Sequence, residues 1–183
     1  MTLADQLTAA RMVATPFVVG LFAWNFPDHA YWATALFIVA MATDQVDGWL
    51  ARRAGRTTAI GALLDPIADK ILVLAALVML TGQGVVPAWM VALTIAREIL
   101  ISGLRLAAIE RGIVIRARDL AKLKTWAQAI ACGFGGFAAA GAWRHDFAWW
   151  SLLVALVLTW ASAIDYVRVA PQLLRGRAGA AAA

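Results

Sequence analysis

The sequence predicts an all-α membrane protein, a polytopic bundle of six transmembrane helices preceded by a short interfacial helix. Three observations support this class. Hydrophobic residues make up 63% of the chain and charged residues 15%, whereas a soluble domain is about half apolar. The mean hydropathy is +0.76, and the apolar residues fall into runs long enough to cross a bilayer. Basic residues gather in alternate connections between these runs, as the positive-inside rule describes.

The predicted elements follow one another with short connections. Residues 3–11 place apolar side chains on one helical face and polar ones, among them Asp5 and Arg11, on the other, which predicts the interfacial helix. The apolar stretch from Met12 to Phe26 lacks a small-residue cleavage site, so we expect it to stay in the protein. We expect one domain over residues 1–177 and a disordered Ala-rich tail over 178–183. The spans are expected at residues 11–26, 31–54, 59–81, 85–109, 119–141 and 148–169.

The charges predict the orientation of the spans. Basic residues cluster after the second, fourth and sixth spans, while the other connections hold one, Arg144. The positive-inside rule therefore places both termini in the cytoplasm. The net charge of +5 indicates a membrane surface rather than nucleic acid as partner. Six tryptophans fit an aromatic belt at the opposite, outer ends of the spans: Trp24, Trp32, Trp89, Trp143, Trp149 and Trp150.

Four aspartates in the second and third spans are the strongest functional signal. Asp44 and Asp47 are three residues apart, and Asp65 and Asp69 are four apart, so each pair shares one helix face. An aspartate at the centre of a spanning helix costs about 2.5–3.5 kcal/mol on insertion scales. The two spans are joined by a short loop and should be antiparallel neighbours. We therefore expect the four carboxylates to converge just below the cytoplasmic interface.

Converging carboxylates call for a cation between them, because like charges otherwise raise each other's pKa. Oxygen ligands without His or Cys select hard ions such as Mg²⁺, Mn²⁺ or Ca²⁺, and Cys132, the only cysteine, excludes a cysteine-type zinc site. Four carboxylates suit two divalent ions, which recur in phosphoryl chemistry. Gly48 and Gly61 leave space beside the aspartates, and Arg52 follows where it could pair with a phosphate.

The residues alone also allow two other interpretations of the aspartates and glycines. The aspartates could pair with Lys70, Arg97 or Arg105 inside the membrane, and the glycines could serve helix packing. A divalent-cation transporter is a rival function, since intramembrane aspartates also mark ion paths. A continuous path should carry polar groups in the outer half too, where this chain offers mainly Trp, Ala and Val.

From Asp44 to Asp69 the chain reads Asp-x2-Asp-Gly-x2-Ala-Arg-x8-Gly-x3-Asp-x3-Asp. This pattern resembles the signature of the CDP-alcohol phosphotransferase family throughout its length. Residues 68–70, 96–98, 102–105 and 122–125 are also similar to the bacterial CDP-diacylglycerol–glycerol-3-phosphate 3-phosphatidyltransferases, or phosphatidylglycerophosphate synthases. The start of the chain resembles that subfamily as well, although Asp5 stands where an Asn is usual.

The resemblance implies a homodimer of six-helix subunits in the bacterial inner membrane, with its active site open to the cytoplasm. It implies a metal-dependent enzyme that uses Mg²⁺ or Mn²⁺ and transfers a phosphatidyl group from CDP-diacylglycerol to glycerol 3-phosphate, with CMP as product. Membrane lipids are the other partners, and no nucleic acid is expected. By position, metal ligands would be Asp44, Asp47, Asp65 and Asp69, with Asp69 also the general base. Contacts to the CDP moiety would come from Asp47, Gly48, Arg52 and Gly61.

An acceptor that carries a phosphate needs a second cationic pocket. The candidates are basic residues near the cytoplasmic ends of the fourth and fifth spans: Arg105, Lys122 and Lys124, with Arg97 and Arg118 behind them. The same chemistry with another acceptor remains an alternative, and inositol phosphate, serine and phosphatidylglycerol are the acceptors to consider.

Overall fold

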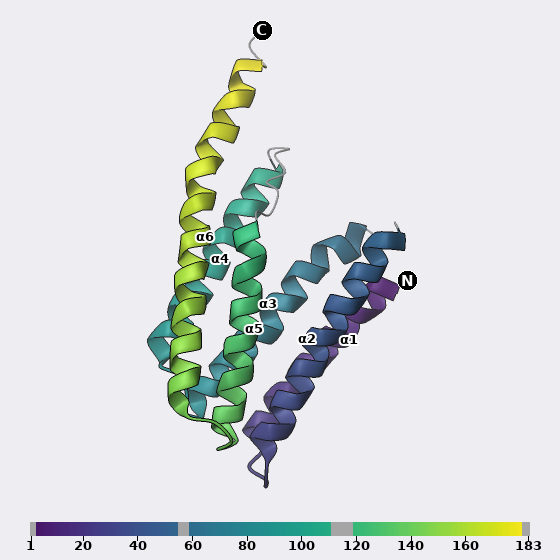
Figure 1. Ribbon diagram of the computed structural model, residues 1–183. Coiled ribbons are helices and arrows are strands. Elements are labelled where there is room, and N and C mark those ends of the chain that lie inside the picture. Colours follow the sequence, from purple (N-terminus) through teal and green to yellow (C-terminus); the bar gives the residue numbers. More distant parts are fainter. Residues whose placement is uncertain (1–2, 55–58, 111–118, 181–183) are drawn as a thin grey trace.

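The computed structural model describes the backbone of residues 3–54, 59–110 and 119–180 of the 183-residue chain. It describes the side chains of residues 9–43, 68, 70–108, 123–164 and 167. All of the secondary structure in these described ranges is helical (Figure 1). The helices are α1 (Leu3–Ala23), α2 (His29–Ala54), α3 (Ala59–Gly82), α4 (Ala88–Glu110), α5 (Asp119–Ala139) and α6 (His145–Ala180).

The six helices agree with the six segments expected from the sequence, and two ends differ. α1 is one continuous helix from Leu3, so the prediction of a separate interfacial helix is wrong. Arg11 is buried rather than turned to an interface, because Arg11, Thr15, Val18 and Phe22 form one buried stripe along α1 at i, i+4, i+7 and i+11 spacing. α6 continues to Ala180, so residues 178–180 are helical, in keeping with the high helix propensity of alanine.

The helices form a splayed bundle. Figure 1 shows α1 and α2 together on one side, α4, α5 and α6 on the other, and α3 between them. α1 packs against α2 and α3, α5 packs against α6, α2 and α3, and α4 contacts α3 and α6. The helices approach one another at the end where α1, α3 and α5 finish, and they spread apart toward the end where α2, α4 and α6 finish. The second end is the one that the basic residues assign to the cytoplasm.

Tight turns close the narrow end of the bundle. Gly84 has φ 71° and Gly141 has φ 72°, a left-handed conformation that glycine adopts at no steric cost and that commonly ends helices. The amide of Gly141 donates to the carbonyl of Ala138 over 3.0 Å, and that of Gly84 donates to Thr81 over 3.0 Å. The side-chain amide of Gln83 donates to the carbonyl of Phe22, which ties the end of α3 to the end of α1.

Close packing of α5 against its neighbours depends on two glycines. A Cβ at Gly136 would lie 2.0 Å from Oγ1 of Thr34 on α2, and a Cβ at Gly135 would lie 2.6 Å from Cδ1 of Leu80 on α3. Such small residues let helix backbones approach closely, as membrane helix interfaces often require. The glycine pair therefore sets how near α5 lies to both α2 and α3.

Large apolar side chains cover much of the outer surface of the bundle. Exposed examples occur on every helix, including Phe17, Val39, Val78, Ile99 and Val157, and large apolar side chains exposed in this number are unusual for a soluble protein. Within the described residues, one segment, His145–Ile164, is long and apolar enough by itself to cross a membrane. Three shorter apolar helical segments accompany it, at Ala9–Ala23, His29–Thr43 and Lys70–Gly82. The expectation of six helices is confirmed for the described residues, while six membrane spans stay a prediction.

The predicted aromatic belt lies at the narrow end of the bundle. Five of its six tryptophans are exposed and the other, Trp149, is partly buried; the exposed ones are Trp24, Trp32, Trp89, Trp143 and Trp150. They stand in or beside the connections at this end or in the first turns of α2, α4 and α6. Exposed tryptophans at one level are typical of a membrane–water interface.

Replacement of Gly136 by alanine should destabilise the bundle, because the new methyl group would overlap the side chain of Thr34. Overpacking of this kind costs about 1–3 kcal/mol. The measurement is the thermal unfolding midpoint of the purified protein in detergent. Gly133→Ala is the matched control, since nothing lies within 4 Å of its added Cβ. Adding Thr34→Ala to Gly136→Ala should restore part of the loss, and an equal midpoint for the two single variants would contradict the packing argument.

Candidate functional site

The four aspartates lie on the two helix segments that flank residues 55–58. Asp44 and Asp47 belong to the second half of α2, and Asp65 and Asp69 to the first half of α3. At 1.5 Å of rise per residue, all four lie about 10–16 Å along their helices from that connection. Their side chains are outside the described ones, as are those of Arg52 and Lys122, the surroundings of Gly48 and Gly61, and the whole of Arg118. The convergence of the carboxylates therefore stays a prediction.

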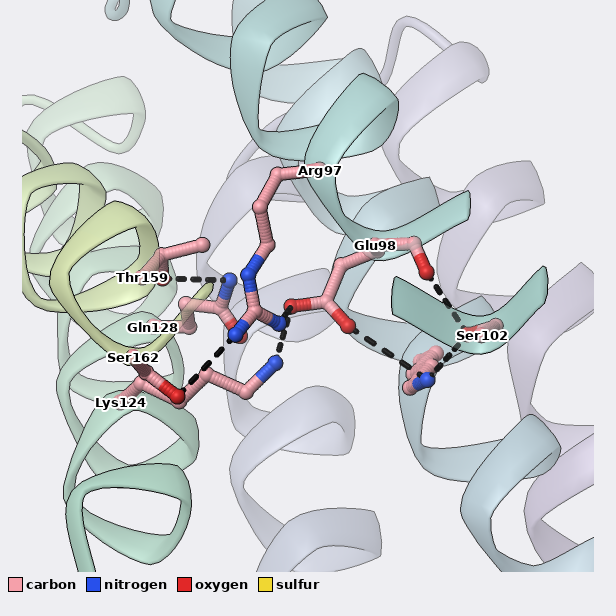
Figure 2. A network of polar contacts seen from close by, with 8 residues as sticks. Arg97, Glu98, Ser102, Lys124, Gln128, Thr159 and Ser162 are labelled. Atoms are coloured by element: carbon pink, nitrogen blue, oxygen red, sulfur yellow. Dashed lines mark hydrogen bonds and ion pairs between the residues drawn. The ribbon is translucent and has the colours of Figure 1, made fainter. Parts of the chain in front are cut away.

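The described side chains alone contain no group of three or more His, Cys, Asp or Glu that could hold a metal ion. They do contain a buried polar cluster, formed by Glu98, Arg97, Lys124 and Lys70 and drawn in Figure 2. We call it the Glu98 cluster. It begins on α3 at Lys70, the residue directly after Asp69.

Glu98 is the centre of this cluster, and α4 carries it into the bundle interior. Its Oε1 atom accepts a hydrogen bond from Nη1 of Arg97 over 2.9 Å and a second one from Nζ of Lys124 on α5. Its Oε2 atom lies 3.5 Å from Nζ of Lys70 on α3. One carboxylate thus links three helices (Figure 2). Cations surround the Glu98 carboxylate because a buried charge without partners is energetically costly.

Ser102 completes the contact between α3 and α4. Nζ of Lys70 donates a hydrogen bond to Oγ of Ser102 over 2.5 Å. The Ser102 hydroxyl in turn donates to the backbone carbonyl of Glu98 over 2.7 Å. Glu98 and Ser102 are four residues apart, so both project from one face of α4, and Lys70 contacts this face at two points.

Arg97 and the neighbouring polar residues connect the cluster to α6. Nη2 of Arg97 donates to Oγ of Ser162 over 3.1 Å. One turn beyond Lys124 on α5, the amide of Gln128 donates to Oγ1 of Thr159 over 3.3 Å (Figure 2). Polar side chains on α4, α5 and α6 are therefore paired across the helix interfaces, as the burial of polar groups requires.

The electrostatics of the cluster favour an anion. Among the described side chains, three cations surround one carboxylate, so the formal charges of Lys70, Arg97, Lys124 and Glu98 sum to +2 (three minus one); the side chain of Asp69, next to Lys70 in the chain, is outside this sum. Arg105 lies close enough to interact electrostatically with Lys70 and Arg97. A buried surplus of positive charge is expensive, and an anionic ligand would neutralise it.

Arg105 lies between the cluster and the C-terminal end of α4 (Glu110). Glu98, Ser102 and Arg105 follow each other at i, i+4 and i+7, so they share one face of α4. α3 and α4 run antiparallel, and Lys70 on α3 contacts Glu98 and Ser102. Two turns beyond Glu98, Arg105 is thus about 10 Å nearer the end of the bundle where the aspartate segments of α2 and α3 lie.

Sequence reasoning predicted some of these residues and missed others. Of the predicted acceptor-pocket residues, the structure brings Arg97 and Lys124 together and places Arg105 near them. It shows that Arg97 and Lys124 both bind Glu98, which the sequence analysis did not single out. It also adds Lys70, Ser102 and Ser162 to the cluster. The signal that could have revealed Glu98 is its place within an apolar run, where an acidic residue needs a cation on a neighbouring helix.

The sequence is similar to the CDP-alcohol phosphatidyltransferase family. The family model of CDP-alcohol phosphatidyltransferases matches residues 1–161. The chain is 40% identical over 141 residues to the CDP-diacylglycerol–glycerol-3-phosphate 3-phosphatidyltransferase of Bacillus subtilis, an alignment that covers 70% of this chain and 73% of the relative. It is 41% identical over 168 residues to a probable phosphatidylglycerophosphate synthase of Mycobacterium tuberculosis, covering 90% of this chain and 79% of the relative.

A third relative matches over nearly the whole length of both chains. The CDP-diacylglycerol–glycerol-3-phosphate 3-phosphatidyltransferase of Haemophilus influenzae is 36% identical over 176 residues, which cover 90% of each chain. Because the alignment is this long, the likeness includes the helices that carry the Glu98 cluster as well as the aspartate motif.

Replacement of Glu98 by glutamine should strongly destabilise the protein. The amide leaves Arg97 and Lys124, which are buried, and Lys70, which is partly exposed, without their shared carboxylate, and breaking a buried ion pair from one side costs about 3–5 kcal/mol. Unfolding followed in detergent measures the loss. Asp146→Asn is the matched control, because it removes a single carboxylate from an exposed ion pair with Arg144 and should have little effect. If the two variants unfold alike, Glu98 does not hold the cluster together.

Proposed function

Because the chain belongs to the CDP-alcohol phosphatidyltransferase family, we propose that it transfers the phosphatidyl group of CDP-diacylglycerol to sn-glycerol 3-phosphate. The products are phosphatidylglycerophosphate and CMP, and the reaction is a step of phospholipid biosynthesis. The relatives from B. subtilis and H. influenzae are named for this reaction. The observation that carries the proposal is the complete aspartate motif of residues 44–69, followed directly on α3 by a buried cluster with surplus positive charge.

The motif fits the divalent metal ions on which this family generally depends. Asp44, Asp47, Asp65 and Asp69 supply only carboxylate oxygens, and they belong to the helix segments on either side of residues 55–58. Oxygen donors suit Mg²⁺ or Mn²⁺, and we propose that the four residues hold two such ions. When bound, the ions would neutralise the pyrophosphate and stabilise the charge that develops on the departing CMP.

The residues of the chain have distinct proposed roles in the transfer. Asp69 accepts the proton of the acceptor hydroxyl, whose oxygen forms a bond to the phosphatidyl phosphorus while the bond from that phosphorus to the CMP oxygen breaks. Arg52 pairs with the donor phosphates, and Gly48 and Gly61 leave room for the CDP moiety beside Asp47. Arg105 contacts the acceptor phosphate, with Lys122 and Arg118 on the cytoplasmic side. Arg97 and Lys124, held by Glu98, supply the charge behind it.

The surplus positive charge favours a phosphorylated acceptor over serine. Inositol phosphate would satisfy the same charge, and phosphatidylglycerol carries a phosphate as well, so both are acceptors to compare directly. A divalent-cation transporter is disfavoured, because the family model matches residues 1–161 and because tryptophan and aliphatic side chains are exposed in the outer half.

We also propose that the protein spans a bacterial inner membrane six times as a homodimer, with both termini and the active site in the cytoplasm. The exposed apolar side chains on all six helices and the tryptophans at the narrow end support membrane insertion. The basic residues, which gather at the ends of α2 and α4 and around the start of α5, support the orientation. The homodimer rests on the family resemblance.

The reaction itself can be tested by CMP release from CDP-diacylglycerol in detergent micelles with purified protein. We expect release with glycerol 3-phosphate and none with free glycerol, since only the former offers a charge to the basic cluster. Removing divalent ions by chelation should abolish release, and Mg²⁺ or Mn²⁺ should restore it. Undiminished CMP release after exhaustive chelation would contradict the proposed requirement for metal ions. Preferential use of serine or inositol phosphate would show that glycerol 3-phosphate is not the acceptor.

The role of Asp69 can be separated from that of the other aspartates. Asp44→Asn, Asp47→Asn and Asp65→Asn should weaken binding of the metal and of CDP-diacylglycerol together. Asp69→Asn should lower kcat more than it weakens CDP-diacylglycerol binding, because a general base acts chiefly in the transition state. The measurements are equilibrium binding of the donor and steady-state kinetics of each variant. Equal loss of donor binding in all four variants would remove the case for Asp69 as base.

The orientation can be tested with single cysteines in a Cys132→Ala background, which removes the only native thiol. Arg144→Cys should react with a membrane-impermeant thiol reagent added to intact cells, since Arg144 is exposed in the connection before α6. Arg116→Cys should react only after the membrane is permeabilised. The opposite labelling pattern would invert the topology.

A further inference from the structure

The three cations of the Glu98 cluster are not equivalent. The side chains of Arg97 and Lys124 are 2% and 10% exposed, whereas that of Lys70 is 28% exposed. Arg97 and Lys124 share the Oε1 atom of Glu98. The ammonium of Lys70 lies 3.5 Å from Oε2, beyond the usual length of an N–H···O hydrogen bond, about 2.7–3.2 Å. Glu98 therefore engages Arg97 and Lys124 closely and leaves Lys70 accessible to a further partner.

Lys70 stands at the middle of α3 (Ala59–Gly82), where contact between its ammonium and lipid would be unfavourable. A charged group at that depth faces a bundle interior or a water-filled space. The exposed apolar face of α3 is marked by Ile71 and Val78, and successive residues of a helix are rotated by about 100°. Lys70 is turned toward α4 instead, where it meets Ser102 and Glu98.

The position of Lys70 joins the two parts of the proposed active site. It is the neighbour of Asp69 in the chain, with Cα atoms about 3.8 Å apart. Arg105 is close enough to act on it electrostatically and lies one turn beyond Ser102 on the same face of α4. Lys70 and Arg105 thus border the side of the cluster that is nearer to the aspartate segment of α3.

We propose that Lys70 is a direct ligand of the acceptor phosphate and that Glu98 and Ser102 position its ammonium for this role. The proposal rests on the proposed function and adds a binding residue to it. The described side chains of the cluster carry a formal charge of +2, and a phosphate monoester, which is close to a dianion at neutral pH, would pair with such charge. An ammonium has three donors, so Lys70 can bind Ser102 and still donate to phosphate. Arg97 and Lys124 then act through Glu98 and through their charge.

The test compares Lys70→Gln with the wild type in purified, metal-loaded form, with glycerol 3-phosphate and CDP-diacylglycerol varied in turn. We expect the KM for glycerol 3-phosphate to rise about ten- to a hundredfold, as the loss of a charge-assisted contact implies. The KM for CDP-diacylglycerol should change less than about twofold, within the spread of such measurements. Lys70→Arg keeps the charge and should recover most of the acceptor affinity.

Two further variants separate binding from folding. Ser102→Ala removes a contact to the ammonium without changing any charge, so it should raise the acceptor KM more mildly and leave the donor KM unchanged. Gln128→Leu is the matched control, since it breaks a buried polar contact to Thr159 on α6 without touching Lys70, and both KM values should stay at the wild-type level. If Lys70→Gln does not fold, the Ser102→Ala result decides.

These measurements separate a failure of the Lys70 assignment from a failure of the proposed function. An unchanged acceptor KM in Lys70→Gln, or in Ser102→Ala where the first variant is unfolded, overturns the assignment of Lys70. A rise in the donor KM alone also overturns it and assigns Lys70 to the CDP-lipid site. If the wild type releases no CMP with glycerol 3-phosphate but does so with another acceptor, the proposed acceptor fails instead.

Discussion

The packing of α3, α4 and α5 in the middle of this bundle depends on one buried carboxylate, that of Glu98. Glu98 is nearly inaccessible, and it holds cations from α3, α4 and α5. Removal of a charge from water costs several kcal/mol for each ion, so the arrangement depends on the hydrogen bonds that Oε1 accepts from Arg97 and Lys124 and on the ammonium of Lys70 near Oε2, which accepts no hydrogen bond from the described groups. α3, α4 and α5 must therefore keep a fixed register at the depth of Glu98. The same register fixes how Lys70, and with it the adjacent Asp69, is presented along α3.

The distribution of charge explains why this cost is tolerated. The aspartate motif concentrates four acidic residues on α2 and α3, and the Glu98 cluster with Arg105 concentrates basic residues on the adjoining parts of α3, α4 and α5. Each group alone would be unfavourable in an apolar surrounding. Metal ions would balance the first group and a phosphorylated acceptor the second, so the charges of the chain itself would favour both ligands. Preorganised charge of this kind is the usual source of stabilisation in phosphoryl transfer.

Much of the fold could be predicted from the sequence, because apolar runs and charge placement report directly on helix position. All six helix segments were found, and the continuous α1 and the long α6 were the departures. Arg11 misled the prediction because its charge suggested an interface, whereas the stripe it shares with Thr15 and Val18 buries it. Glu98 was missed for a different reason. Its importance arises from Lys70 and Lys124, which lie 28 and 26 residues away on other helices, and no local pattern encodes such pairing.

The adjacency of Asp69 and Lys70 gives the proposed site a way to select its acceptor. A residue that takes a proton from the hydroxyl and a residue that binds the phosphate would be neighbours on one rigid helix, turned about 100° apart. Glycerol 3-phosphate carries its hydroxyl and its phosphate on a single three-carbon chain, so one small molecule can meet both. Binding at Lys70 would then orient the hydroxyl toward Asp69, and an acceptor without the phosphate would lose orientation as well as affinity. Because loss of orientation lowers the rate as well as the binding, selection against free glycerol would be stronger than the loss of one ion pair implies.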